Sequence, residues 1–328
     1  MDRSRPFRIL SIDGGGVRGI IPARFLQALE EMSQQPIHTL FDLIVGTSTG
    51  GLIALGLTCP HQQQQGPKYS AQAIVDFYLK ESGSIFKGSF LRSMTTGVGL
   101  WGAKYDRKPF DAILENFFGD TRLSEALSKV VLPTYSLIEK TPHLFSSTEA
   151  KNTKIDYWMH DIAGATSAAP TYFDPKIFQD SQGKKCIDID GGIFANNPES
   201  IAAMEAYKQQ PNLERKDIFL ISMGTGSIQF NRRSDQLSNA GVIGWVMKAN
   251  LIDLMMSADS DWYNDEISAI YPNASRLQVS LPENLGAMDE ATPQALQGLL
   301  DLAEAFVHSH TTQLQNLVTM LRPGGVNK

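Results

Sequence analysis

The feature that most constrains the fold is the pentapeptide Gly46-Thr47-Ser48-Thr49-Gly50, which lies between two apolar segments. The apolar run at residues 41–45 predicts a buried strand, and the run at residues 51–55 predicts the start of a helix. A serine in a sharp strand-to-helix turn carries its hydroxyl above the end of a sheet, where a substrate carbonyl can reach it. Glycines on both sides permit the strained turn and a close approach of strand and helix. We therefore predict that Ser48 is a nucleophile; the alternative is a buried serine in a glycine-rich turn.

A second glycine-rich segment, Asp13-Gly14-Gly15-Gly16-Val17-Arg18-Gly19, follows a predicted strand and precedes a predicted helix. Consecutive glycines let several backbone N–H groups point at one position, and the N-terminus of a helix adds positive potential. Such a loop binds either a phosphate or the oxyanion of an acyl-transfer reaction. The glycine spacing also fits a dinucleotide-binding fingerprint, but the acidic residues about 20 positions later, Glu30 and Glu31, fall inside the helical pattern. We favour an oxyanion hole over a nucleotide site.

A serine nucleophile needs a group that accepts its proton. Of the six histidines, only His308 and His310 follow Ser48 in the order of a hydrolase triad, and both lie in a helical pattern rather than in a loop after a strand. Asp190 is better placed, because the alternating segment 185–190 ends at it and Gly191-Gly192 follow.

The choice of Asp190 leaves two alternatives open. Asp-Gly pairs are common in ordinary turns, and Asp188 lies two residues earlier on the same face of the strand. We prefer Asp190 because it directly precedes the glycine pair. An aspartate with its reference pKa of about 3.9 is a weak base. Burial must therefore raise the pKa, or the carboxylate must mainly stabilise the departing proton in the transition state.

These three motifs, taken together, resemble those of the patatin-like phospholipase family. They occur in the order of that family, and the separation between Ser48 and Asp190 is in its usual range. Further similarity lies at residues 165–173, at Asn197-Pro198 and at residues 222–226, so the resemblance covers about residues 7–230.

The resemblance implies a Ser48–Asp190 dyad without a catalytic histidine. It also implies an oxyanion hole built from the backbone of Gly14, Gly15 and Gly16, in a loop that Arg18 steadies. The remaining motif positions are Gly19, Gly46, Gly50, Gly191 and Gly192. The implied reaction is hydrolysis of lipid acyl esters through a serine-bound acyl intermediate, with no metal, nucleotide or other cofactor. The implied substrate is a phospholipid or lysophospholipid at a membrane surface. Two alternatives with the same dyad stay open: an acyltransferase and a ligand-activated, membrane-damaging phospholipase.

Composition narrows the class of protein. The chain has 328 residues, of which 42% are hydrophobic and 20% charged, which is typical of a globular protein with a full core. The net charge of −6 argues against a nucleic-acid partner and against purely electrostatic membrane binding. Cys59 and Cys186 form neither a disulfide framework nor a metal site. Residues 1–6 lack the apolar segment of a signal peptide, and the apolar stretch 40–59 is too polar for a transmembrane segment. We expect a cytoplasmic protein; membrane-surface contact and signal-less export are alternatives.

The order of the predicted elements favours an α/β fold. Strands are predicted at 7–12, 41–46, 130–137, 143–147, 186–190, 217–223 and 275–280. Helices are predicted at 20–33, 50–58, 70–80, 108–117, 156–168, 198–209, 235–256, 260–270 and 291–321. This alternation predicts a three-layer α/β/α arrangement with a mostly parallel central sheet. We expect a catalytic domain at 7–230 and a helical C-terminal elaboration at 231–328 packed on it. The apolar segments 83–105 and 242–256 are candidates for the rim and acyl groove of the site; each also fits a buried core.

Overall fold

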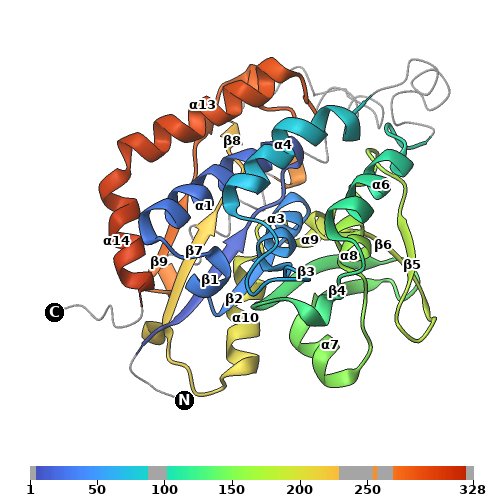
Figure 1. Cartoon of the computed structure of the whole chain (residues 1–328), viewed down its shortest axis with the longest axis horizontal. Coiled ribbons are helices and arrows are strands. Elements are labelled where there is room, and N and C mark those ends of the chain that lie inside the picture. Colours follow the sequence, from blue (N-terminus) through green and yellow to red (C-terminus); the bar gives the residue numbers. More distant parts are fainter. Residues whose placement is uncertain (1–4, 88–101, 229–253, 257–268, 323–328) are drawn as a thin grey trace, which may run out of the picture.

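The computed structural model describes residues 5–87, 102–228, 254–256 and 269–322 (Figure 1). Most of the predicted helices 235–256 and 260–270 lies outside these residues. The greater part of both apolar candidate segments, 83–105 and 242–256, also lies outside them.

The centre of the fold is an eight-stranded sheet whose paired strands follow one another as β5-β6-β3-β2-β1-β7-β9 (Figure 1). β4 pairs with one edge of β3, whereas β2 and β6 pair with different parts of its other edge. Its strands are β1 (Phe7–Ile12), β2 (Leu43–Gly46), β3 (Lys129–Ser136), β4 (Thr141–Ser146), β5 (Lys176–Gln179), β6 (Lys185–Asp190), β7 (Ile218–Met223) and β9 (Ala274–Leu277). The five strands from β9 to β3 are parallel, whereas β4, β5 and β6 join by antiparallel pairing. A small separate sheet pairs β8 (Ser227–Ile228) with β10 (Ser280–Leu281).

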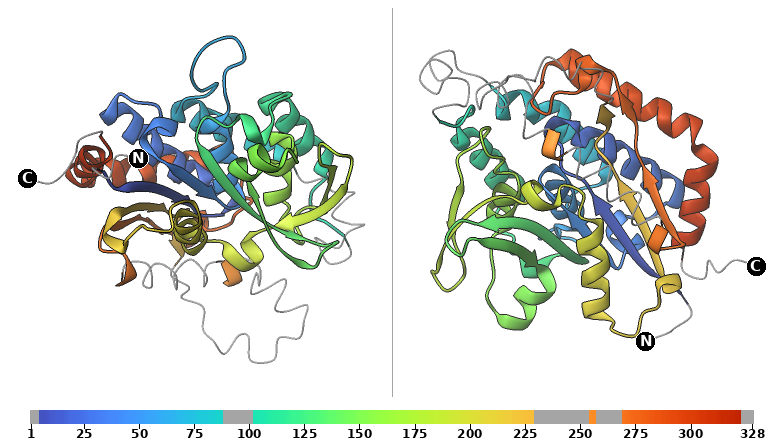
Figure 2. Two further views of the ribbon diagram at one scale, coloured as in Figure 1. Left: turned by 90° about the horizontal axis from the view of Figure 1, so that it is seen from below. Right: turned by 180° about the vertical axis from the view of Figure 1, so that it is seen from behind.

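Helices cover both faces of the sheet (Figure 2). The described helices are α1 (Ile20–Ser33), α2 (Ile37–Leu40), α3 (Thr49–Thr58), α4 (Ala71–Ile85), α6 (Arg107–Phe118), α7 (Ser147–Thr153), α8 (Met159–Thr166), α9 (Gly192–Ala195), α10 (Glu199–Gln209), α13 (Pro293–Ser309) and α14 (Thr311–Leu321). Short 3-10 turns occur at η1 (Gly16–Gly19), η2 (Leu123–Glu125), η3 (Arg215–Asp217) and η5 (Glu283–Leu285). The predicted three-layer fold with a mostly parallel sheet is confirmed.

Two apolar cores separate the layers. The larger core packs α1, α3, α4, α6, α8, α13 and α14 against one face of the sheet, and the smaller core lies beneath α10 on the other. Every residue of α3 is buried, because this helix lies between the sheet and its neighbouring helices. None of the described helices has both the length and the apolar character needed to cross a bilayer.

Several elements differ from the sequence-based predictions; the short elements α2, α7, α9, β8 and β10 were not predicted, and three further differences have a clear physical cause. α4 continues five residues past the predicted end, because Ser82 and Ile85 are buried against the core. β5 was not predicted, because its buried Lys176 breaks the apolar pattern and is accommodated by ion pairs with Asp111 and Asp161. The single helix predicted at 291–321 is two helices, which separate at His310.

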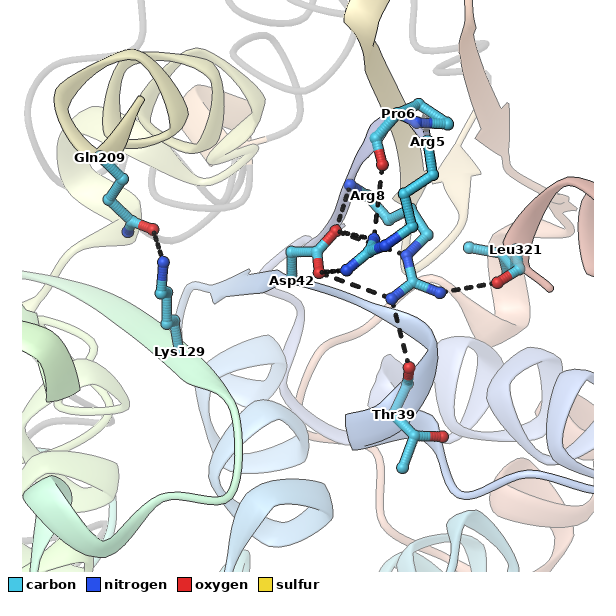
Figure 3. A network of polar contacts seen from close by, with 8 residues as sticks. All are labelled: Arg5, Pro6, Arg8, Thr39, Asp42, Lys129, Gln209 and Leu321. Carbon is cyan, nitrogen blue, oxygen red and sulfur yellow. Dashed lines mark hydrogen bonds and ion pairs between the residues drawn. The ribbon is translucent and has the colours of Figure 1, made fainter. Parts of the chain in front are cut away.

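The C-terminal part of the chain is joined to the rest by a strand and by helices. β9 extends the sheet beside β7, and α13 and α14 pack along α1 (Figure 1). At the N-terminal ends of the strands, Arg8 donates to the carbonyl oxygen of Leu321 at 2.7 Å and lies beside Asp42 at 3.4 Å (Figure 3). Residues on both sides of position 230 thus share one sheet and one core; the domain boundary itself stays a prediction.

Candidate active site

Ser48 lies in the turn between β2 and α3 with φ 54° and ψ −122°, a backbone conformation that residues other than glycine rarely adopt. The turn is tight, since a Cβ on Gly50 would collide with the carbonyl oxygen of Ile12 and one on Gly46 would collide with Gly50. The Ser48 amide donates to the hydroxyl of Thr166 at 3.0 Å. The local sequence therefore builds the strained turn, and a hydrogen bond from α8 fastens it.

Asp190 is the last residue of β6 and is fully buried. Its backbone amide donates to the carbonyl oxygen of Ala168 at 3.0 Å, and its Oδ1 accepts from the Gly192 amide at 2.7 Å. Burial raises the pKa of the carboxyl to about 7, opposed by the Gly192 amide and by the nearby Ser48 hydroxyl. Oδ2 of Asp190 accepts no hydrogen bond from the described residues.

The edge of β3 explains why these two turns meet. β4 occupies one edge of β3 along residues 131–136. On the other edge, β2 pairs with residues 129–131 and β6 pairs with residues 134–136. Because β2 runs parallel to β3 and β6 runs antiparallel, their C-terminal ends face each other across residues 132–133. Ser48, which follows the end of β2, and Asp190, which is the last residue of β6, are thereby brought together.

The alternative proton acceptors have other partners. Asp188 accepts from the Thr134 hydroxyl at 2.7 Å and lies 3.5 Å from Nδ1 of His143. His310 stacks on Phe306 at the junction of α13 and α14, and His308 is exposed on α13. Neither His308 nor His310 is among the described residues that line the pocket around Ser48.

The glycine-rich loop lies directly beside Ser48, since a Cβ on Gly14 would be 3.2 Å from the Ser48 Cβ. The Gly14 amide already donates to the carbonyl oxygen of Asn196 at 3.0 Å. Within the part of the chain that the structure describes, the N–H groups of Gly15 and Gly16 donate to no acceptor. Of the three glycines predicted to be oxyanion donors, Gly14 thus has its amide engaged by Asn196, whereas the amides of Gly15 and Gly16 are available; the oxyanion role itself stays a prediction.

Long-range contacts hold this loop at both ends. Arg18, which is buried, donates from Nε to the Gly15 carbonyl oxygen at 3.4 Å and from Nη1 to the Gly286 carbonyl oxygen at 3.2 Å. The buried Asp13 carboxylate pairs with Arg276 at 2.5 Å. Arg276 also lies 3.2 Å from Glu199, so one cation offsets two buried anions.

Sequence reasoning missed four residues of this surrounding shell. Thr166, Asn196 and Thr225 lie in or beside segments that had been noted for their similarity, but no role had been assigned to them. Arg276 carries no recognisable signal, because an isolated arginine in a short strand looks like any surface residue until its partners are known.

A pocket opens beside Ser48 and is almost entirely apolar. The residues that line it are Gly16, Ser48, Thr49, Leu52, Phe77, Tyr78, Ser82, Ile85, Phe86, Phe110, Ser167, Ala169, Tyr172, Phe173, Met256 and Met288. No charged side chain is among these described lining residues. An apolar pocket of this kind can hold a hydrocarbon chain with one end at the Ser48 hydroxyl.

The described residues offer no obvious metal site, since no three histidine, cysteine or acidic side chains converge among them. The chemistry that this geometry can support is nucleophilic attack by a hydroxyl next to a buried carboxylate and two unoccupied amide donors.

Comparison with known proteins identifies the family of this chain. The family model for patatin-like phospholipase matches residues 10–203. The chain is 36% identical to patatin-like protein 3 of Arabidopsis thaliana, with 93% of this chain and 82% of the relative aligned. It is 31% identical to patatin-like protein 2 of Oryza sativa subsp. indica, with 93% and 85% aligned.

Two further similarities complete the comparison. Human GIVD cytosolic phospholipase A2 aligns with a TM-score of 0.48 and 10% identity, over 98% of this chain and 60% of that structure. A relative at 32% identity, over 78% of this chain and 72% of its own length, is described as probable inactive patatin-3-Kuras 1 of Solanum tuberosum. The family model and the sequence relatives together show that the chain belongs to the patatin-like phospholipase family.

Proposed function

We propose that this protein is a serine lipid acyl hydrolase of the phospholipase A or lysophospholipase type, acting through a Ser48–Asp190 dyad and an acyl-enzyme intermediate. The single observation that carries the proposal is the Ser48 hydroxyl, held by a strained turn beside the fully buried Asp190 carboxyl. Family membership alone is not sufficient support, since one relative is described as probably inactive.

In the acylation step, Ser48 Oγ attacks the ester carbonyl carbon while Asp190 accepts the hydroxyl proton. A carboxylate with a pKa near 7 is a far better base at neutral pH than an exposed aspartate. Asp190 then returns the proton to the alkoxide leaving group as the ester C–O bond breaks. The acyl group is left on Ser48 Oγ.

In the deacylation step, water attacks the acyl-serine carbonyl carbon and Asp190 accepts a proton from that water. Release of the fatty acid returns the proton to Ser48 Oγ and regenerates the dyad. In both steps the carbonyl oxygen gains negative charge, which the amides of Gly15 and Gly16 are placed to stabilise. Loss of one such donor in other hydrolases costs about 10²- to 10³-fold in rate.

The lining of the pocket supports a fatty acyl substrate. Its aromatic and aliphatic side chains would surround a hydrocarbon chain, and Ser48 is among the few polar residues that line it. Burial of each methylene of the chain contributes about 0.8 kcal/mol of binding free energy at best. Long-chain esters are therefore expected to be preferred over short ones.

The test uses purified wild-type protein and the variants Ser48→Ala and Asp190→Asn. Release of fatty acid from phosphatidylcholine and lysophosphatidylcholine in mixed micelles is measured, together with labelling by a fluorophosphonate. Both variants should fold and lose essentially all hydrolysis, and the label should map to Ser48 in wild type. His308→Ala serves as the matched control and should keep wild-type activity. Full hydrolysis by Asp190→Asn combined with its loss in His308→Ala would replace the dyad with a triad.

A further inference from the structure

A short segment before α13, residues 286–289, lies across the glycine-rich loop; we call it the strap. The amide of Val17 donates to the carbonyl oxygen of Met288 at 2.8 Å, and Arg18 donates to Gly286. Gly16 has a positive φ of 59°, and a Cβ there would collide with the Met288 carbonyl oxygen. The strap therefore touches the loop at three consecutive residues, one of which carries a free amide.

The other side of the strap is fastened by Asp289. Its carboxylate forms an ion pair with Lys104 and accepts a hydrogen bond from the Tyr105 hydroxyl at 2.7 Å. The side chain of Asp289 is only 12% exposed, whereas that of Lys104 is 35% exposed, so the carboxylate end of these contacts is largely shielded from solvent.

The residues that hold Asp289 pack against the wall of the pocket. The backbone amides of Lys104 and Tyr105 donate to the carbonyl oxygens of Thr171 and Tyr172, both at 2.9 Å. The Tyr105 ring packs on Tyr172 and Phe173, which line the pocket. Asp289 thus connects the wall that surrounds a bound acyl chain to the loop that carries the oxyanion donors.

The two ends of the loop are held independently. At its start, Asp13 is fixed by Arg276 from β9, a contact that does not involve the strap. At its end, Gly16 to Arg18 depend on Met288 and Gly286. Loosening the strap should therefore displace the Gly16 amide while the start of the loop stays in place.

We propose that Asp289 is a positioning residue for the acyl-transfer reaction, because it holds the strap against the loop and so keeps the Gly15 and Gly16 amides aimed at the developing oxyanion. The proposal rests on the serine hydrolase function proposed above. Asp289 acts through the strap and does not itself touch the substrate.

The experiment compares Asp289→Ala and Asp289→Asn with Glu290→Ala in the full chain. Glu290 is the adjacent residue, is exposed, and acts on Tyr105 through charge alone, so its variant controls for the loss of one negative charge. Hydrolysis of a soluble p-nitrophenyl ester gives kcat and KM without a contribution from membrane binding. The second-order rate of fluorophosphonate labelling and the midpoint of urea unfolding are measured on the same samples.

We expect Asp289→Ala to lower kcat and the labelling rate by about 10- to 100-fold, a partial loss of oxyanion stabilisation, with KM changed less than about twofold. Asp289→Asn keeps an acceptor for Tyr105 and should recover part of the rate. Glu290→Ala should match wild type. If Asp289→Asn loses less kcat than Asp289→Ala while the two variants unfold at the same urea midpoint, the loss of rate comes from positioning and not from a general loss of stability.

Two results would overturn the proposal. One is an unchanged kcat in both Asp289 variants below their unfolding range, which would make the strap a purely structural contact. The other is an equal loss in Glu290→Ala, which would assign the effect to charge. The Ser48→Ala protein separates these results from a failure of the proposed hydrolase function. If Ser48→Ala hydrolyses the ester as fast as wild type, the hydrolase function itself is wrong; if it does not, only the role of Asp289 is in question.

Discussion

The turn that carries Ser48 and the turn that carries Asp190 meet at one edge of β3, but different forces constrain them. The Ser48 turn is constrained by sterics: a positive φ, and glycines packed against backbone atoms of β1 and α3. The Asp190 turn has no positive φ at Gly191 or Gly192, although a Cβ on Gly191 would collide with the carbonyl oxygen of Pro133; its distinctive constraint is the burial of a carboxyl group without solvent.

This difference indicates how each half of the dyad responds to change. A side chain added at the Ser48 turn has nowhere to go, because the atoms around it belong to backbone and cannot rotate away. At the Asp190 turn the backbone angles are ordinary, and the distinctive cost is the buried charge. In the proposed mechanism, catalysis gains from both conditions, since the first fixes the nucleophile and the second makes the acid a base near neutral pH.

The largest effect is expected at Gly50. Gly50→Ala would place a Cβ against the carbonyl oxygens of Ile12 and Asp13, both backbone atoms, and should cost on the order of 4 kcal/mol or more of unfolding free energy. Soluble yield and urea unfolding measure the loss. Gly56→Ala on the same helix is the control, because its Cβ would meet side chains rather than backbone: the flexible end of Ile74, and the Phe117 ring at an ordinary 3.4 Å. Equal stability of the two variants would show that the Ser48 turn is not sterically constrained.

The next largest effect is a gain in unfolding free energy rather than a loss, because removal of the Asp190 charge should stabilise the fold. The folded-state pKa of about 7 lies above the unfolded value of 3.8, so the native state binds more protons between these pH values. Stability contributed by this group therefore falls as pH rises from about 4 to 7, by about 4 kcal/mol at most.

Asp190→Asn should thus gain stability over wild type as pH rises, with the gain levelling off above about pH 8. The unfolding free energy in urea, measured from pH 5 to pH 9, provides the test. Ser48→Ala keeps the carboxylate and should retain the pH dependence of wild type. A constant difference between Asp190→Asn and wild type across that range would show that burial does not raise the pKa.

The smallest effect concerns Thr166, which connects the two halves. Its hydroxyl accepts from the Ser48 amide and donates to the Pro133 carbonyl oxygen at 2.8 Å, the atom against which Gly191 packs. Thr166→Val should cost about 1–3 kcal/mol of unfolding free energy, because it leaves both groups buried without partners.

Thr153→Val is the matched control for this change. Thr153 also donates to a carbonyl oxygen and accepts from an amide, but it is exposed to solvent. Its loss should cost less than about 0.5 kcal/mol. The rate of fluorophosphonate labelling should fall in Thr166→Val alone. Equal labelling in both variants would indicate that the Ser48 turn holds its shape without α8.

Much of the fold could be predicted from local patterns. The strands β1, β2, β3, β6 and β7 lie within two residues of their predicted bounds, because apolar runs with glycine or proline boundaries are local signals. The buried Lys176 of β5 and the break at His310 could not be predicted in this way. Each depends on partners or packing that come from elsewhere in the chain.

The candidate site likewise has a part that could be predicted from local sequence and a part that depends on long-range contacts. Ser48 and its glycines are identifiable from five consecutive residues, since a strand-to-helix turn requires only its own neighbours. The use of the Gly14 amide by Asn196, by contrast, joins residues 182 positions apart and changes which amides can serve as donors. In the sequence, the strap and Arg276 are separated from the glycine-rich loop by even more residues, although they contact it directly.

By itself, the sequence determined the order of strands and helices, the nucleophile turn and the glycine-rich loop, because each depends on residues adjacent in the chain. Only the tertiary structure decided that β2 and β6 end face to face on β3, that Asp190 is wholly removed from water, and that residues near the C-terminus hold the loop. Burial and long-range hydrogen bonds arise from the packing of distant segments, and no local pattern specifies them.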